Sequence, residues 1–314
     1  MLRTLGKSDI RITPIGLGMM QFAGRMTGFQ NIRKEEKRAI VKAALDGGIN
    51  WFDTAEAYGF GLSERGLSDG LQAAGMKDGD IFIATKWLPV PRTAGNIKRT
   101  ITSRQRHLSP YSIGLHQVHA PYGFSATENE MNAMADLVEA GVIGSVGVSN
   151  FGAERMRRAH KALEKRGIPL VSNQLQYSLI YRKIETSGVL ETARELGITI
   201  IAWSPIGSGI LTGKFHKDPE LLKKTTLARR LSLERKMKNT GLLIGVLDEI
   251  ATAHQVTQAQ VALNWLINFH GDTVVAIPGA SIVNHAIESA GVMKFTLSEE
   301  EMARLDEASK DFRT

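Results

Sequence analysis

Strand-like and helix-like segments alternate along this chain, and that alternation most constrains its fold. Eight short apolar runs with the character of buried β-strands lie at 15–20, 49–53, 81–86, 112–119, 143–149, 170–174, 198–203 and 272–277. Amphipathic stretches with helical spacing lie between them near 34–47, 63–75, 94–107, 128–140, 152–166 and 185–196. Eight β/α alternations predict a closed (β/α)8 TIM barrel, which commonly takes about 250 residues plus insertions. We therefore expect one α/β domain over residues 1–314.

Three kinds of segment lie outside the repeat. Residues 3–12 predict an N-terminal β-hairpin, because the short segments RTL and IRI flank the turn-prone stretch GKSD. After the seventh strand, residues 214–240 are basic and weakly periodic, so we interpret them as a long mobile loop. The pair Ser298 and Glu301 forms a capping-box pattern that opens a terminal helix. Extra C-terminal helices are thus expected at 242–254, 258–269 and 297–310.

A doubly wound open sheet is the rival α/β fold. Its G-x-G-x-x-G fingerprint would lie between the first strand and the first helix. Gly16 and Gly18 are present there, but no matching third glycine follows them. The barrel is therefore the favoured architecture.

The composition is that of an ordinary soluble globular protein, with 43% apolar and 23% charged residues. No run of about 18 apolar residues could span a bilayer, and the first ten residues lack the apolar core of a secretion signal. The simplest location is the cytoplasm, without a membrane partner. Zero cysteines exclude disulfides, a cysteine nucleophile and thiolate-held metals.

The formal charge of +7 includes a basic cluster between Lys223 and Lys238. Such a cluster attracts a phosphorylated cofactor or a nucleic acid in some proteins, but a mixed basic segment is more often a solvated helix face. No RNA-binding aromatic motif or zinc-finger spacing accompanies it. We expect no nucleic-acid partner, and the oligomeric state stays open.

Four polar side chains lie at or just after the C-terminal ends of three successive predicted strands. Asp53 and Tyr58 follow the second strand. Lys86 ends the third strand and His119 ends the fourth. In a (β/α)8 barrel the loops at these strand ends meet at one open mouth, where reactive groups gather. The topology therefore permits the four side chains to come together.

These four side chains have the chemistry of a proton donor for a carbonyl group. A phenol such as Tyr58 is a weak acid with a pKa near ~10, and a nearby ammonium such as Lys86 would lower that pKa. A carboxylate such as Asp53 would keep the lysine charged and aimed. The imidazole of His119 could hydrogen-bond the substrate oxygen and set its approach.

Each of the four residues also has a structural explanation when taken alone. An aspartate near a strand end usually caps a helix, a tyrosine packs, a lysine supplies a rim charge, and a lone histidine is a satisfied structural group. A metal pair of His116 and His119 is disfavoured, because residues three apart in a strand face opposite sides, and we expect no metal. The joint placement at one mouth is what favours catalysis.

Three motifs contain these residues, INWFDTAEAYG, IFIATK and LHQVHAP, and a fourth motif, VGVSNF, follows them in the same order. On these motifs the chain resembles the aldo-keto reductase family, and the likeness runs from the opening LGKSDIRITPIGLGMM to IPGA at 277–280. The resemblance implies an NAD(P)(H)-dependent oxidoreductase. It would transfer hydride between nicotinamide and the carbonyl carbon of an aldehyde, ketone or sugar, with Tyr58 as proton donor.

The resemblance also carries cofactor-binding roles onto later segments. Ser149, Asn150 and Gln174 would hydrogen-bond the nicotinamide carboxamide, and Trp203 would lie against its ring. The glycines of 204–214 would let backbone amides approach the pyrophosphate. The expected cofactor-binding residues are Ser149, Asn150, Gln174, Trp203, Ser204, Pro205, Ile206, Gly207, Gly209, Leu211, Lys214, Pro278, Gly279, Ala280, Ser281, His285 and Ser289.

The choice between NADP(H) and NAD(H) stays open. NADP(H) is expected from the family, whose NADPH-preferring members usually carry a basic residue just after the glycine of the segment 277–289, which we interpret as a loop. Ala280 and Ser281 occupy that place here, and a neutral His285 is a poorer anion partner than arginine. NAD(H) use therefore remains an alternative.

The small-molecule carbonyl substrate is expected to meet Met20, Phe22, Trp87 and Tyr122, framed by the long 204–240 segment. Apolar walls of this kind suit an aldehyde or ketone with a nonpolar side. They do not select one substrate, because barrel loops vary independently of the barrel chemistry.

Three other functions use part of the same residue set. A Schiff-base lyase could use Lys86 but would leave the segments SNF (149–151), NQ (173–174) and SPIGSG (204–209) unexplained. A metal-dependent hydrolase would need clustered His and Asp ligands, and no H-x-H follows the first strand. A nucleotide-binding regulatory subunit of a potassium channel, with little turnover, would retain all four residues.

Overall fold

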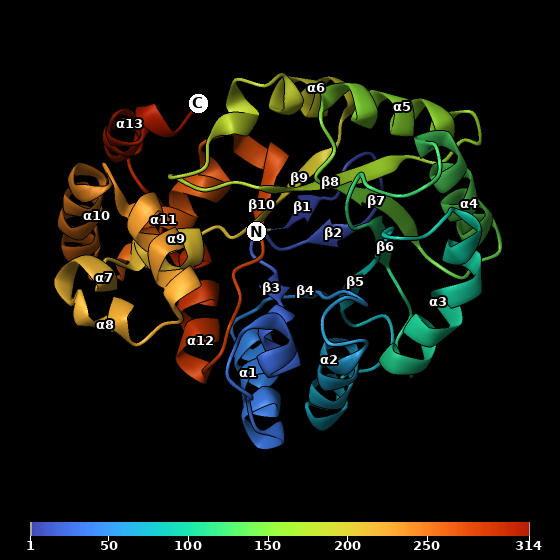
Figure 1. Ribbon diagram of the computed structural model, residues 1–314, viewed down its shortest axis with the longest axis horizontal. Coiled ribbons are helices and arrows are strands. Elements are labelled where there is room, and N and C mark those ends of the chain that lie inside the picture. The colour runs from blue at the N-terminus through green and yellow to red at the C-terminus, as the bar shows by residue number, and fades with distance from the viewer. Residues whose placement is uncertain (1, 314) are drawn as a thin grey trace.

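Eight parallel strands form the centre of the computed structural model, which describes residues 2–313 apart from the side chains of Ala228 and Arg229 (Figure 1). Each strand pairs with its neighbours in chain order, from β3 to β10. Parallel bridges between Ile15 and Ala276 and between Gly18 and Gly279 join the first strand to the last, which confirms the (β/α)8 prediction. The strands are β3 (Leu17–Gly18), β4 (Trp51–Asp53), β5 (Phe82–Trp87), β6 (Leu115–Val118), β7 (Ser145–Ser149), β8 (Leu170–Gln176), β9 (Thr199–Trp203) and β10 (Val274–Ala276).

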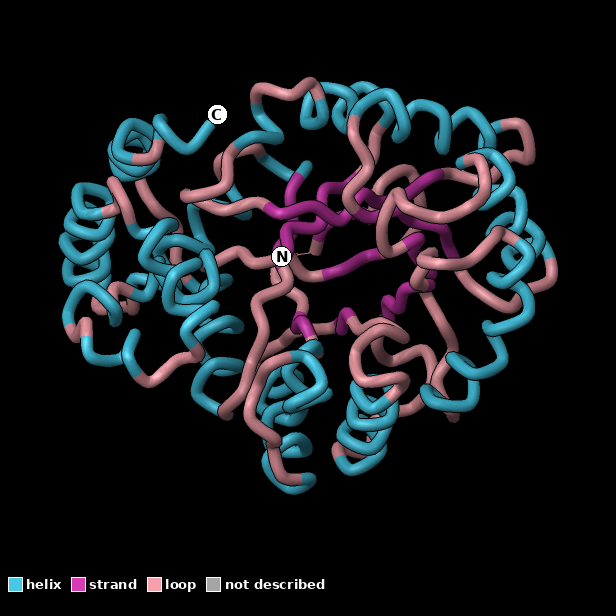
Figure 2. Tube along the Cα trace, viewed as in Figure 1, coloured by secondary structure: helices cyan, strands magenta, loops and turns pink. Residues whose placement is uncertain are grey.

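Helices surround these strands as an outer layer (Figure 2). Their apolar faces pack on the outside of the strands, so the barrel is buried on both faces, as parallel sheets require. The helices between the strands are α1 (Lys34–Asp46), α2 (Leu62–Ala73), α3 (Gly95–Leu108), α4 (Thr127–Glu139), α5 (Ala153–Glu164) and α6 (Val189–Leu196). The sixth helix was predicted from residue 185, but the chain there first makes a short 3-10 turn, η2 (Lys183–Glu185).

The interior of the barrel has an apolar lower layer. The predicted hairpin, β1 (Arg3–Thr4) with β2 (Arg11–Ile12), is present. Its Ile12 and the adjoining Leu5 share one buried cluster with Trp51, Ala84 and Leu115. Trp51, Ala84 and Leu115 lie on β4, β5 and β6. Side chains of a strand alternate between faces, so the residues two positions later also face inward, and these are Asp53, Lys86 and Gln117. The barrel is thus apolar near the hairpin and polar at the opposite, C-terminal mouth.

The segment 214–240 is not the irregular loop that its weak periodicity predicted. It contains three short helices, α7 (Lys214–Lys217), α8 (Glu220–Lys223) and α9 (Leu227–Met237). Leu222 and Leu233 are buried there, so tertiary packing overrides the weak local pattern. In Figure 1, α9 lies beside the barrel mouth, and it contacts the 3-10 segment η3 (Gly207–Thr212).

Four further helices complete the C-terminal part: α10 (Gly241–His254), α11 (Gln258–Asn268), α12 (Val283–Gly291) and α13 (Glu299–Ala308). The predicted capping box of Ser298 and Glu301 opens α13. The interpretation of 277–289 as a loop was wrong from Val283 onward, because Ala286, Ser289 and Ala290 are buried at helical spacing where α12 packs on α1.

None of the helices formed by the described residues combines the length and the apolar character that a bilayer crossing requires.

Candidate active site

Lys86 is the centre of a fully buried ion pair at the barrel mouth. Its Nζ donates to Oδ1 of Asp53 and, over 2.9 Å, to the carbonyl oxygen of Thr54. Lys86 is 0% exposed and Asp53 is 1% exposed. A third contact runs from Nζ to the hydroxyl of Tyr58, over 3.5 Å. The predicted acid, cation and carboxylate therefore lie in one contact chain.

The β4–α2 loop brings Tyr58 to this pair. Asp53 ends β4, the amide of Thr54 donates to the carbonyl of Ala84 over 2.8 Å, and the chain then turns back toward β5. Glu56 fixes the turn, because its carboxylate accepts from the amide of Leu88 over 2.6 Å and pairs with Arg104 of α3. The loop that carries Tyr58 is thus tied to the end of β5, where Lys86 lies.

Burial changes the acidity expected for Tyr58. Desolvation raises the pKa of the Tyr58 phenol, and this effect exceeds the lowering of that pKa by the Lys86 charge. The predicted lowering of the Tyr58 pKa by the Lys86 charge is present, but desolvation reverses the net direction of the shift. Desolvation lowers the pKa of Lys86, but Asp53 and Tyr58 together raise it above its ordinary value. At neutral pH the site thus holds a protonated phenol beside an ammonium.

His119 lies next to the phenol ring of Tyr58. Its ring is 5.7 Å from the Tyr58 ring, centroid to centroid, in an edge-on arrangement. Desolvation, and then the charge of Lys86, lower the pKa of His119 to about 3, so the imidazole is neutral at physiological pH. Its Nδ1 is buried without a partner among the described residues. A neutral imidazole can donate one hydrogen bond, which is the role predicted for His119.

A second polar group lies at the ends of β7, β8 and β9. Asn150 has a left-handed backbone with φ of 62°, and its Nδ2 donates to Ser149 Oγ over 3.0 Å and to the His119 carbonyl over 3.2 Å. Trp203 Nε1 donates to Asn150 Oδ1 over 3.2 Å. Gln174 Nε2 donates to Asp53 Oδ2, the oxygen that Lys86 does not contact, over 2.8 Å. The structure therefore joins the predicted carboxamide-binding residues to the predicted catalytic ones.

The segment after β9 places a cation beside a glycine-rich turn. Gly207 and Gly209 have positive φ angles of 57° and 94°, which favour glycine. A Cβ built on Gly209 would lie 3.5 Å from Lys214 Nζ, so that ammonium faces the glycine backbone. Desolvation and, to a smaller extent, the Lys214 charge lower the pKa of His285 of α12. The amides of Gly207 and Gly209 donate to the carbonyls of Ser204 and Ile206, over 3.0 Å each, so the ammonium and the nearby imidazole are the groups that fit the phosphates of a dinucleotide.

The other predicted cofactor-binding residues follow the ends of β9 and β10. Ser204, Pro205, Ile206 and Leu211 follow β9, and Pro278, Gly279, Ala280 and Ser281 follow β10. Ser281 Oγ lies 3.3 Å from His285 Nδ1. The hydroxyl of Ser289 is already used within α12, where it donates to the His285 carbonyl over 2.7 Å.

A family model described as "Aldo/keto reductase family" matches residues 14–310. The chain is 31% identical to the chloroplastic pyridoxal reductase of Arabidopsis thaliana, over 96% of this chain and 84% of that protein. It is 30% identical to the aldo-keto reductase yakc [NADP(+)] of Schizosaccharomyces pombe, over 95% of this chain and 88% of that protein. The chain belongs to the aldo/keto reductase family.

A solved structure agrees with this membership. The thermostable aldo-keto reductase Tm1743, crystallised with the inhibitor epalrestat, superposes with a TM-score of 0.77. The two chains are 29% identical, and the match covers 98% of this chain and 99% of that one. The carbonyl oxidoreductase class and the barrel architecture of this aldo/keto reductase thus have independent support.

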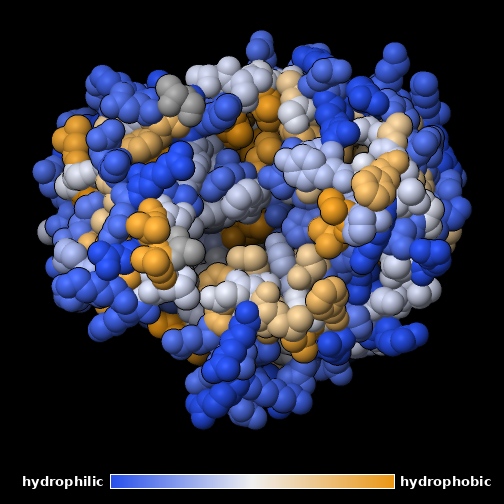
Figure 3. Space-filling view, viewed as in Figure 1, coloured by the Kyte–Doolittle hydropathy of each residue, from blue (hydrophilic) through white to orange (hydrophobic). Residues whose placement is uncertain are grey.

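The mouth of this aldo/keto reductase carries an apolar rim. Figure 3 shows a hollow at the centre of this face, with hydrophobic residues gathered beside it. Large apolar side chains are exposed on the loops that follow β3 to β6, namely Met20, Phe60, Val90, Tyr122 and Phe124. Met20 and Tyr122, predicted to meet the substrate, therefore lie at the rim.

Two other predicted substrate residues lie elsewhere. Phe22 is 2% exposed and packs beneath α2, with Lys37 Nζ 5.5 Å from its ring. Trp87 is 1% exposed, and its Nε1 donates to Asn96 of α3 over 3.0 Å. Trp87 follows the inward-facing Lys86 in β5, so strand alternation turns it toward the helices. Neither side chain presents surface to a substrate.

The residues suggested for a metal are separated as strand alternation predicts. His116 is buried, and desolvation, followed by the charge of Arg104 of α3, lowers its pKa to about 3. His119 lies at the mouth. Within residues 2–313, no group of three or more His, Asp or Glu side chains is placed to hold a metal ion. The paired, strongly basic Lys86 is also unsuited to Schiff-base formation, which needs a neutral amine.

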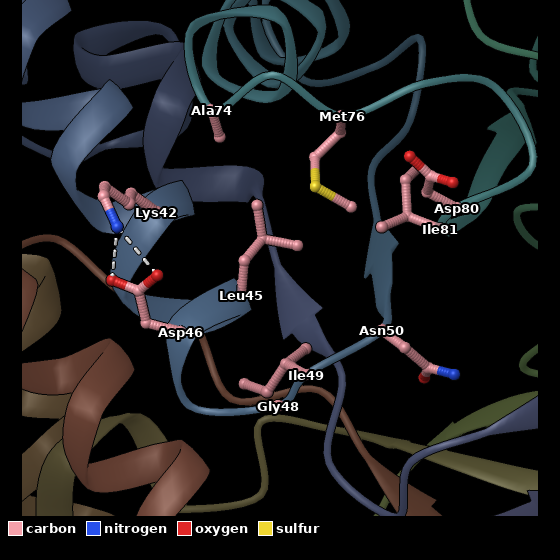
Figure 4. Close-up of a pocket in the computed structure, with 10 residues that line it drawn as sticks. All are labelled: Lys42, Leu45, Asp46, Gly48, Ile49, Asn50, Ala74, Met76, Asp80 and Ile81. Atoms are coloured by element: carbon pink, nitrogen blue, oxygen red, sulfur yellow. Dashed lines mark hydrogen bonds and ion pairs between the residues drawn. The ribbon is translucent and has the colours of Figure 1, made fainter.

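A separate pocket of about 390 Å³ lies at the opposite end of the barrel (Figure 4). It lies between the ends of α1 and α2 and the segments that lead into β4 and β5, with the Lys42–Asp46 ion pair at its edge. Its lining includes Leu45, Asn50 and Met76. In TIM barrels this N-terminal end serves stability, so the site is assigned from the residues at the mouth.

The loop after His119 rests on a buried acid. Glu130 of α4 is 2% exposed, and its Oε1 has no hydrogen-bond partner in the described part of the chain. A Cβ added to Gly123 would clash with that oxygen, so the loop backbone covers the carboxyl group. Desolvation raises the pKa of Glu130 to about 7, against a smaller opposing effect of Arg155. The folded protein therefore favours the neutral acid.

We predict that Glu130 lowers stability as the pH rises. Its folded pKa lies above its unfolded one, so stability present in acid is lost as the pH rises through about 7. The E130Q variant should lack this loss. Between pH 5 and pH 8 the free energy of unfolding of the wild type should therefore fall relative to that of E130Q by about 1–3 kcal/mol. Urea denaturation at both pH values measures it.

The matched control for this prediction is E128Q. Glu128 lies on the same helix but pairs with Arg158 at the surface, and a side-chain hydrogen bond from Arg158 lowers its pKa to about 2. Glu128 is thus charged throughout this pH range, and E128Q should follow the wild type. Parallel pH dependences of E130Q and the wild type would contradict the assignment of Glu130.

Proposed function

We propose that this protein is an NAD(P)(H)-dependent oxidoreductase that interconverts an aldehyde, ketone or sugar carbonyl and the corresponding alcohol, with Tyr58 as the proton donor. The observation that carries the proposal is the position of the Tyr58 hydroxyl. It lies 3.5 Å from the buried Lys86 ammonium, with the His119 ring edge-on to the phenol. Family membership supports a carbonyl oxidoreductase.

The chain's own residues account for the movement of the proton. Tyr58 is protonated at neutral pH, and its hydroxyl would donate to the carbonyl oxygen as that oxygen gains negative charge. The Lys86 ammonium would stabilise the phenolate that remains, and Asp53 would hold that ammonium in place. The neutral imidazole of His119 would donate a hydrogen bond to the same oxygen. Oxidation of an alcohol uses these steps in reverse.

A nicotinamide dinucleotide supplies the hydride when it is bound. Ser149, Asn150 and Gln174 would hold its carboxamide, and Trp203 would pack on its ring. Gly207 and Gly209, which have no Cβ, would let its pyrophosphate approach the backbone, and the Lys214 ammonium would face the adenosine end of the dinucleotide beside His285. The left-handed Asn150 and the hydrogen bond from Trp203 fix two of these side chains before any ligand binds.

The cofactor preference follows from the charges at the α12 end of the site. Desolvation lowers the pKa of His285, so this side chain is neutral at physiological pH. Lys214 is a positively charged group that acts on His285. The relative from Schizosaccharomyces pombe is designated NADP(+). We propose that NADP(H) is preferred over NAD(H), with a smaller margin than an arginine would give.

We predict that both reduced dinucleotides quench the fluorescence of Trp203, and that NADPH binds more tightly by at most about 10-fold, because one ammonium contributes to the difference. Titration with each dinucleotide measures the two Kd values. W203F should lose the quenching but keep binding measurable by calorimetry. The tighter dinucleotide is then used with a panel of aromatic and aliphatic aldehydes, ketones and sugars.

The outcomes of this experiment separate the proposal from its alternatives. Binding followed by oxidation of the dinucleotide with an aldehyde or ketone supports the proposed function. Tight binding without turnover on any carbonyl would favour a nucleotide-binding regulatory subunit instead. Absence of binding to either dinucleotide would remove the proposed function.

A further inference from the structure

The oxygen of Asp53 that faces away from Lys86 is held by two amides. Gln174 Nε2 donates to Asp53 Oδ2 over 2.8 Å, and Gln117 Nε2 donates to the same oxygen over 3.2 Å. The two amides also meet, with Gln174 Nε2 3.5 Å from Gln117 Oε1. Asp53 therefore uses one oxygen for the lysine and the other for a pair of glutamines.

All of these groups lie inside the barrel and away from water. Gln117 is 0% exposed, and Gln174 is also buried. Gln117 lies on β6 two residues before His119, so strand alternation points both side chains inward. The register places Gln117 opposite Lys86 on β5. The amide thus reaches the ion pair from a strand that contributes to neither of its charges.

We propose that Gln117 is a positioning residue for the proton transfer, which it supports by holding Asp53 so that the carboxylate keeps the Lys86 ammonium beside Tyr58. The contact chain runs from Gln117 through Asp53 and Lys86 to Tyr58, so Gln117 acts through the ion pair. The inference rests on the proposed function and assigns a residue that the sequence did not single out.

The physical reason is that a buried carboxylate needs donors on both oxygens. Hydrogen bonds to charged groups in a low-dielectric interior are stronger than those between neutral groups, and each fixes orientation as well as charge. Without the Gln117 amide, Asp53 Oδ2 retains the bond from Gln174 alone and has more freedom to turn away from Lys86. The ammonium is then less well placed to stabilise the phenolate of Tyr58.

The test is Q117M, which keeps the length of the side chain and removes both polar atoms. We expect kcat to fall about 10-fold, as for the loss of one hydrogen bond to a charged group, with KM for the dinucleotide unchanged. In the alcohol-oxidising direction Tyr58 must lose its proton. The pH at which kcat reaches half its maximum should therefore move upward by about 0.5–1 unit.

A second variant, Q117E, tests the same contact without removing a polar group. It places two carboxyl groups within hydrogen-bond distance, so one of them must hold a proton to bond the other. We expect kcat close to that of the wild type in acid and a steep loss as the pH rises. Q117E conserves the shape of the side chain, so a role of Gln117 in packing alone would leave kcat unchanged at every pH. The expected pH dependence therefore distinguishes the positioning of Asp53 from packing.

The matched control is S172A, in the same barrel interior. Ser172 is buried on β8, and its Oγ has no hydrogen-bond partner among residues 2–313. This variant should keep the wild-type rate and pH profile. Wild-type pH profiles for both Q117M and Q117E would overturn the inference. If the wild-type protein turns over carbonyls in that experiment, the proposed function stands regardless.

Discussion

Replacing Tyr58 with phenylalanine is expected to lower kcat by about 10²–10⁴-fold, the usual contribution of a positioned general acid. The variant loses one oxygen atom. It keeps the aromatic ring that lies edge-on to His119, with Lys86 Nζ 5.0 Å from its centroid. Dinucleotide binding should therefore be unchanged, and only the chemical step should suffer. Steady-state kinetics and a fluorescence titration of the same preparation measure the two quantities.

Y111F is the matched control for this experiment. The Tyr111 hydroxyl donates to the Met76 carbonyl over 2.9 Å, beside the segment that leads into β5 and far from the mouth. Y111F should keep full turnover, with at most a small loss of stability. A Y58F protein that keeps wild-type kcat would remove Tyr58 from the mechanism, whatever its dinucleotide affinity.

Replacing Lys86 with methionine should abolish most turnover and also destabilise the fold. The substitution leaves the Asp53 carboxylate buried without its counter-ion. Breaking a buried ion pair on one side commonly costs about 3–5 kcal/mol. The same change removes the positive charge that stabilises the Tyr58 phenolate. Denaturant unfolding measures the first effect, and kcat measures the second.

The double variant K86M/D53N separates these two effects. The added D53N substitution removes the unpaired carboxylate charge, so most of the lost stability should return. Turnover should not return, because the ammonium beside Tyr58 is still missing. Recovery of both quantities together would mean that Lys86 serves the fold alone and would contradict its catalytic role.

The sequence predicts the barrel well because the barrel follows from local patterns. Each apolar run became a strand, and the inward residues Asp53 and Lys86 lie at strand ends where parallel strands share one mouth. The capping box at Ser298 depends on adjacent residues and was also predictable. These features need only short-range periodicity and the geometry of one repeated unit.

Other features depend on contacts that a single sequence does not display. The helices within 214–240 form because Leu222 and Leu233 find apolar neighbours, although their own segment is weakly periodic. Trp87 was predicted to meet the substrate, whereas strand alternation turns its side chain outward to Asn96 of α3. Gln117 was missed, yet its place two residues before His119 indicates that it faces inward.

The pKa of Tyr58 is another property that the sequence alone does not determine. The sequence correctly predicted a lysine next to the phenol, which lowers its pKa. It does not show the depth of burial, and desolvation raises the pKa by more than the lysine lowers it. The sign of the net shift depends on that balance, which needs the three-dimensional structure.

The most direct test of the account follows the hydride itself. The protein is incubated with an aromatic aldehyde and NADPH that carries deuterium at both C4 positions, and the product alcohol is analysed by mass spectrometry. We predict one deuterium on the carbinol carbon with the wild-type protein and almost no product with Y58F. An alcohol without deuterium, or equal product from Y58F, would contradict direct transfer assisted by the Tyr58 hydroxyl.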